Sequence, residues 1–160
     1  MLSLVKDCSV NRFISVMAFL LCSFVVEAQV LVDDAYVRGL PPGQTTTAAF
    51  MQLKNISGEE VIITGAQTGS SESAEIHAHI HHNGMMSMKR VNQIVIPANS
   101  IFELKPGGHH LMLIGLKQFL KEGDSVRLSL LQSDGSAINI EAPVRSVLNE
   151  HVNHADHSHH

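Results

Sequence analysis

The feature that most constrains the fold is a series of short apolar segments separated by residues that favour turns. Clusters rich in Gly, Pro, Asn and Asp follow one another along the chain and leave no long helical periodicity. The segments that we expect to form strands are 30–37, 45–54, 61–66, 74–81, 85–96, 101–104, 110–116, 125–132 and 137–143. Strands at this spacing are typical of a β-sandwich or barrel, so a single all-β domain is predicted. A single helical turn is expected at 116–120.

The N-terminal segment predicts export. Lys6 and Arg12 precede an apolar stretch at 13–26, and a small-residue cleavage pattern ends at Ala28, as in a secretory signal peptide. The stretch is shorter than the about 20 residues that a helix needs to cross a bilayer. We therefore expect a signal peptide at 1–28, with cleavage and no stable membrane insertion.

Cleavage after Ala28 would remove both cysteines of the chain, Cys8 and Cys22. Leu21 stands directly before Cys22, where a lipidated cysteine would follow a small residue, so lipidation is not expected. A mature chain that begins at Gln29 then has no disulfide, thiolate metal site or cysteine nucleophile. A blue-copper electron carrier is also excluded, because its site needs a cysteine thiolate.

Charge and motif content exclude two further classes of function. The chain has 11 Lys+Arg against 15 Asp+Glu and no basic run, so a nucleic-acid partner is not expected. No Ser/His/Asp set or carboxylate pair has a recognisable spacing, and we expect no enzyme activity.

Histidine and methionine occur together in this chain. Its 11 histidines fall into three groups: His77, His79, His81 and His82; His109 and His110; and the tail residues His151, His154, His157, His159 and His160. The methionines beside the first two groups are Met85, Met86, Met88 and Met112, whereas Met51 lies in an alternating strand and is assigned to the core. Thioether sulfur is soft and neutral and suits Cu(I) far better than Zn(II). The clustering therefore predicts a Cu(I) site.

Strand periodicity groups the candidate ligands. His110 and Met112 share one face of a strand, with Leu111 and Leu113 on the core side. If Asn83-Gly84 forms a type I′ hairpin turn, Met88 lies directly opposite His79. His77 is then the diagonal neighbour of Met88 on the same face, and both histidines remain candidates.

These residues resemble the periplasmic copper chaperones called PCuAC, or copper A chaperones. The family signature is His, ten residues, Met, twenty-one residues, His, one residue and Met, which matches His77, Met88, His110 and Met112. The flanking segments 34–38, 74–77, 105–113 and 116–124 are also similar, and the resemblance covers roughly residues 30–144.

The resemblance implies a cupredoxin-like or immunoglobulin-like β-sandwich at 29–145 that binds Cu(I) near its surface as a monomer. It implies His77 rather than His79 as the first ligand. It further implies a periplasmic carrier that delivers copper to the copper A centre of cytochrome c oxidase, directly or with Sco-type thiol proteins.

Additional histidines and methionines extend the four-residue pattern. The segment between His77 and Met88 is usually acidic or polar in the family, whereas here it is rich in potential ligands. The accessory ligands that we expect are His79, His81, His82, Met85, Met86 and His109, together with the five tail histidines. The interrupted tail at 146–160 is interpreted as a native, disordered metal-binding segment suited to Cu(II).

Two alternatives to a Cu(I) chaperone remain. A periplasmic copper/zinc buffer or scavenging protein is suggested by the histidine-rich segments, although the paired methionines argue against zinc at the main site. A copper enzyme with an N-terminal histidine brace is disfavoured because Gln29 cannot supply that ligand.

Overall fold

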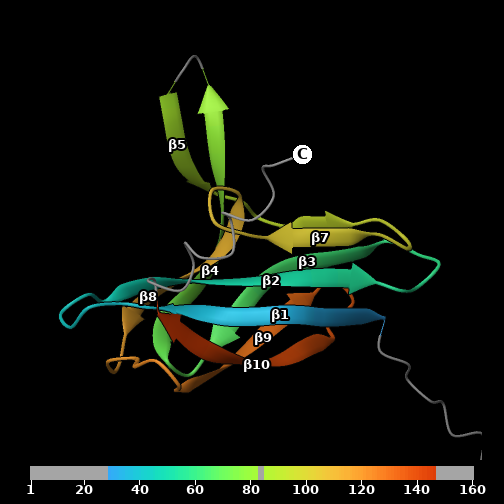
Figure 1. Ribbon diagram of the computed structural model, residues 1–160. Helices are drawn as coiled ribbons and strands as arrows, with labels where there is room; N and C mark the ends of the chain where they lie inside the picture. Colours follow the sequence, from blue (N-terminus) through green and yellow to red (C-terminus); the bar gives the residue numbers. More distant parts are fainter. Residues whose placement is uncertain (1–28, 83–84, 147–160) are drawn as a thin grey trace, which may run out of the picture.

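The computed structural model describes residues 29–82 and 85–146, which form an all-β domain (Figure 1). Within these residues the strands are β1 (Val30–Gly39), β2 (Thr46–Asn55), β3 (Val61–Thr68), β4 (Ser71–His82), β5 (Met85–Arg90), β6 (Ile94–Ile96), β7 (Ile101–Leu104), β8 (His109–Leu116), β9 (Ser125–Gln132) and β10 (Ala137–Ser146). The all-β prediction is confirmed. The predicted signal peptide and the tail beyond Ser146 lie outside the described residues.

Two local expectations are wrong. The segment 85–96 is divided into two strands, β5 and β6. The last contact with β4 is the hydrogen bond from Val91 N–H to Ile76 O, and beyond it β6 pairs with β3. The helical turn at 116–120 does not form. Leu116 is the last residue of β8, and the residues after it form bends and irregular chain; Leu116 N–H donates to Thr45 O and Lys117 N–H donates to Ser70 O.

The strands form a sandwich whose hydrogen bonding continues around its edges. The ladder runs from β4 through β8, β2, β1, β10 and β9 to β3, and the pair Ala66–Ala74 joins β3 back to β4. Parallel pairing occurs between β1 and β10 and between β7 and β8, and the other described pairs are antiparallel. No described helix is long and apolar enough to cross a membrane.

The core lies between the layers and follows the alternation of the strands. Leu111 and Leu113 of β8 are fully buried there, as are Leu128 and Leu130 of β9. Met51 is buried in the same core, which confirms its assignment as a packing residue.

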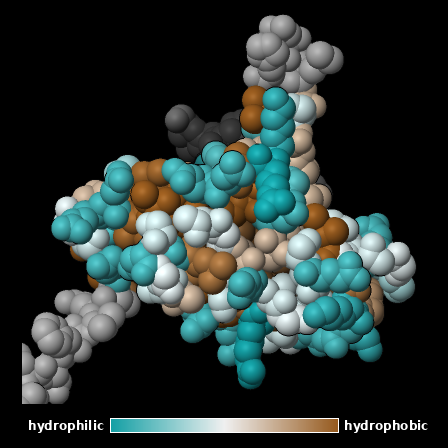
Figure 2. Space-filling model, turned by 180° about the vertical axis from the view of Figure 1, so that it is seen from behind, coloured by the Kyte–Doolittle hydropathy of each residue, from teal (hydrophilic) through white to brown (hydrophobic). Residues whose placement is uncertain are grey.

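The β4–β5 hairpin extends beyond this core. β5 lies at one end of the strand order, with β4 as its neighbour, and the hairpin rises from the body in Figures 1 and 2. The part of β4 nearest the body pairs with β8. Farther out, the side chains of Ile80, Met86 and Met88 are exposed.

Candidate metal centre

An outer face of β4, β5 and β8 carries the residues singled out by the sequence. Because Leu111 and Leu113 point into the core, His110 and Met112 point outward, as predicted. The antiparallel register between β4 and β8 pairs His77 with His110. It also pairs Glu75 with Met112, so these residues share the outward face.

The predicted register of the hairpin is confirmed. His79 lies opposite Met88, and His77 lies opposite Arg90. Met88 is therefore the direct neighbour of His79 and the diagonal neighbour of His77. The turn residues Asn83 and Gly84 lie outside the described residues.

Three imidazole rings come together on this face. The ring centroids of His77 and His110 are 6.0 Å apart, and those of His79 and His110 are 5.2 Å apart. His110 is only 4% exposed, whereas Met88 is 46% exposed. The face thus runs from a buried imidazole at the body to an exposed thioether on the hairpin.

The protonation state of His110 suits a ligand. Its Nδ1–H donates to Gly108 O at 3.1 Å, so in the neutral ring the lone pair is on Nε2. Burial lowers the pKa of His110; the bond to Gly108 opposes this shift, and His79, His77 and Arg38 lower the pKa further. His110 therefore presents a neutral nitrogen donor at neutral pH.

Glu75 and Arg90 orient His77. Nε2–H of His77 donates to Glu75 Oε2 at 3.0 Å, and Arg90 Nη1 donates to Glu75 Oε1 at 3.1 Å. The lone pair of His77 is then on Nδ1, which is buried and has no hydrogen-bond partner among the described residues. Nδ1 of His79 is in the same condition. Unpartnered buried nitrogens beside exposed thioethers are a donor set for a soft metal ion.

Sequence reasoning missed Glu75 and Arg90, although both carried a signal. Glu75 lies two residues before His77 on the same strand face, and the hairpin register that predicted His79 opposite Met88 also brings Arg90 opposite His77. Among the described residues, His, Cys, Asp and Glu side chains alone form no group of three that is placed to hold a metal ion.

Aromatic and cationic side chains border the histidines on the β2 side. The Phe50 ring lies 6.3 Å from the His110 ring and 5.2 Å from the Tyr36 ring. Arg38 Cζ lies 5.0 Å from the centre of the Phe50 ring, and Arg145 Cζ lies 4.7 Å from that of Tyr36. Phe50 was not identified from the sequence, because alternation alone did not show which outward residue of β2 would reach β8.

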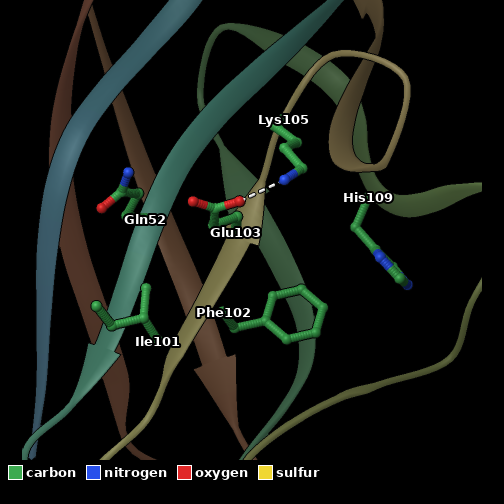
Figure 3. Close-up of a pocket in the computed structure, with 6 residues that line it drawn as sticks. All are labelled: Gln52, Ile101, Phe102, Glu103, Lys105 and His109. Carbon is green, nitrogen blue, oxygen red and sulfur yellow. Dashed lines mark hydrogen bonds and ion pairs between the residues drawn. The ribbon is translucent and has the colours of Figure 1, made fainter.

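His109 is separated from the other histidines. Its ring packs edge-on against Phe102 at 5.1 Å, on the opposite side of β8 from His110. It lines a shallow hollow, shown in Figure 3, with Gln52, Ile101, Phe102, Glu103 and Lys105. Of the other expected accessory ligands, His79 and Met86 share the face of His77 by register. The side chains of His81, His82 and Met85 and the five tail histidines lie outside the described residues.

Comparison with known proteins agrees with this fold. A family profile described as "Putative lipoprotein LpqE-like" matches residues 30–144. "Putative lipoprotein Lxx21020" of Leifsonia xyli subsp. xyli is 36% identical over 117 residues, which cover 72% of this chain and 69% of that protein.

Solved structures resemble the chain over its described domain. Cu(I)-bound DR1885 from Deinococcus radiodurans is 37% identical, with a TM-score of 0.60 over 74% of this chain and 81% of its own. Its apo form is 36% identical, with a TM-score of 0.60 over 76% of this chain and 81% of its own. The apo PCuAC domain from PmoF1, at 17% identity, has a TM-score of 0.63 over 74% of this chain and 95% of its own, a likeness of fold alone. The chain belongs to the LpqE-like family and has the PCuAC fold.

Proposed function

We propose that this protein is an extracytoplasmic copper chaperone that holds Cu(I) with His77, Met88, His110 and Met112. The observation that carries the proposal is the β4–β8 register, which pairs His77 with His110 on an outward face. Met112 follows His110 on the same face of β8, and Met88 lies on the exposed hairpin as the diagonal neighbour of His77. The relative DR1885, at 37% identity, has been solved with Cu(I).

The chemistry of these donors is that of a carrier rather than an enzyme. Two imidazoles and two thioethers are neutral and soft, so they hold Cu(I) without a thiolate that oxidises outside the cell. The same ligands release the ion when a thiolate-rich acceptor competes for it. The acceptors that we propose are the copper A centre of cytochrome c oxidase and Sco-type thiol proteins, which receive copper from the monomeric chaperone.

X-ray absorption on the Cu(I)-loaded mature protein tests the ligand set. We expect both sulfur and nitrogen scatterers around copper, because thioethers and imidazoles share the face. The sulfur contribution should fall in Met112→Leu and stay unchanged in Met51→Leu, which replaces a core methionine. A copper shell without sulfur would rule out the proposed site.

The alternative, a copper/zinc buffer, predicts a different competition result. We expect excess Zn(II) to leave Cu(I) in place at the main site, because thioethers bind Zn(II) poorly. The NMR signals of the methionine methyl groups report whether Cu(I) is bound. Loss of Cu(I) from the site on addition of Zn(II) would favour the buffer. The tail histidines are proposed to bind Cu(II) separately, so the titration should be run on Cu(I) under reducing conditions.

Glu75 is expected to strengthen copper binding through His77. Loss of a carboxylate that orients a metal-binding histidine typically costs about 10- to 100-fold in affinity. We expect about tenfold weaker Cu(I) binding in Glu75→Leu and a smaller loss in Glu75→Gln, which keeps an oxygen acceptor. A competition titration with a chromogenic chelator measures both. Glu103→Leu removes an exposed carboxylate elsewhere and serves as control; equal affinities for Glu75→Leu and wild type would exclude the positioning role.

Export makes a separate prediction. The family and the Leifsonia relative are described as lipoproteins, whereas Leu21 before Cys22 favours cleavage after Ala28. We expect intact-mass spectrometry of the exported protein to give a chain that begins at Gln29. A mass that contains Cys22 and a diacylglycerol would instead show a lipid-anchored form.

A further inference from the structure

The exposed part of the hairpin carries soft donors that the proposed four-ligand set leaves unused. Met86 of β5 is 61% exposed and Met88 is 46% exposed, both on a strand that has β4 as its neighbour. Both thioethers are soft donors that solvent can reach. The register gives Met86 and Met88 the same face as His79.

His79 has a ring nitrogen without a hydrogen-bond partner among the described residues. Its Nδ1 is buried and makes no hydrogen bond among the described residues. A buried polar atom without a partner costs free energy, and a bound metal ion would remove that cost. His79 lies directly opposite Met88, so its imidazole and the Met88 thioether start from the closest pair of positions on the hairpin.

We propose a second, outer Cu(I) position formed by His79, Met86 and Met88, through which the ion passes between solvent and the inner position. The inference rests on the proposed function, since the inner position is the one formed by His77, Met88, His110 and Met112. Met88 belongs to both positions because it is the direct neighbour of His79 and the diagonal neighbour of His77.

The gradient of exposure gives the two positions different tasks. The inner position includes His110, which is 4% exposed, and His77, whose side chain is 14% exposed. The outer position is made of thioethers open to solvent and one imidazole, and an acceptor thiolate can reach it. Successive rungs on one face of a strand are about 6.8 Å apart, so the ion moves by one rung while Met88 stays bound. The step exchanges neutral ligands, and copper remains Cu(I) throughout.

The test removes the inner ligands and asks what remains. In His110→Ala/Met112→Leu we expect Cu(I) affinity to fall about hundredfold or more, with residual binding at the outer position. Adding His79→Ala and Met86→Leu should lower that residual affinity by at least about tenfold. The tail and the hairpin tip are present in every variant, so the difference in affinity between the variants comes from His79 and Met86.

A matched control replaces one histidine and one methionine away from this face. Adding His109→Ala and Met51→Leu to the inner double variant should leave the residual affinity unchanged, because His109 packs on Phe102 and Met51 lies in the core. Equal residual affinities with and without His79 and Met86 would overturn the outer position. Wild-type affinity in the inner double variant would instead refute the proposed function.

Methyl NMR gives a readout independent of affinity. In the inner double variant, Cu(I) should shift the ε-methyl signals of Met86 and Met88, and in the wild type those of Met88 and Met112. The loading rate of the His79→Ala/Met86→Leu variant should fall about tenfold. Unshifted Met86 in the inner double variant, or an unchanged loading rate, would contradict the proposal.

Discussion

Replacing His110 by alanine should lower the Cu(I) affinity of the mature protein by about a hundredfold or more, equivalent to about 3 kcal/mol or more. His110 is the most buried candidate ligand, and the bond from its Nδ1–H to Gly108 O fixes Nε2 as the donor. The adjacent residues of β8 cannot replace it, because Leu111 points into the core and the His109 ring packs against Phe102. Competition with a Cu(I) chelator measures the loss.

His109→Ala is the matched control for this substitution. It removes an imidazole from the adjacent residue, but the His109 ring packs against Phe102 on the other side of the strand. Its copper affinity should equal that of the wild type. Similar losses of Cu(I) affinity in the two variants would mean that either histidine of β8 can contribute to binding, whichever side of the strand it occupies.

Leu111→Ala should lower the free energy of unfolding by about 3 kcal/mol, within the range measured for buried leucines. Leu111 is fully buried between His110 and Met112, and its pairing partners are Ile76 on β4 and Ala49 on β2. Its loss leaves a cavity beneath the strand that carries two proposed ligands. Chemical denaturation of the copper-free protein measures the change.

Two comparisons make the stability result specific. Leu31→Ala truncates a leucine that is 43% exposed on β1, and it should cost well under about 1 kcal/mol. Saturating Cu(I) should raise the stability of Leu111→Ala, because the proposed four-ligand site forms only in the folded state. If Leu111→Ala were as stable as Leu31→Ala, the assignment of Leu111 to the core would be wrong.

The sequence predicted the parts of the face that depend on local rules. Alternation in β8 separated His110 from Leu111, and the turn expected at Asn83-Gly84 predicted the pairing of His79 with Met88. Both follow from residues close together in the chain. The pairing of His77 with His110 joins two strands that are distant in sequence, so no local rule predicts it, and the family spacing alone implied that these residues act together.

Other features depend on contacts that no local pattern specifies. The Glu75 bridge to His77 and Arg90 requires the side-chain geometry of two strands together. The separation of His109 depends on the position of Phe102 in β7, which pairs in parallel with β8. The helical turn expected at 116–120 was wrong because β8 continues to Leu116, and the residues that follow form bends and irregular chain rather than a helix.

The pairing of β4 with β8 also determines when the proposed copper site can form. His77 and Met88 meet within one hairpin, whereas His110 and Met112 arrive only when a strand from much later in the chain joins β4. Non-local strand pairing is late and slow in β proteins. Under the proposed export, a chain that crosses the membrane unfolded would carry no assembled four-donor set, and copper binding at the proposed site would indicate that folding outside is complete.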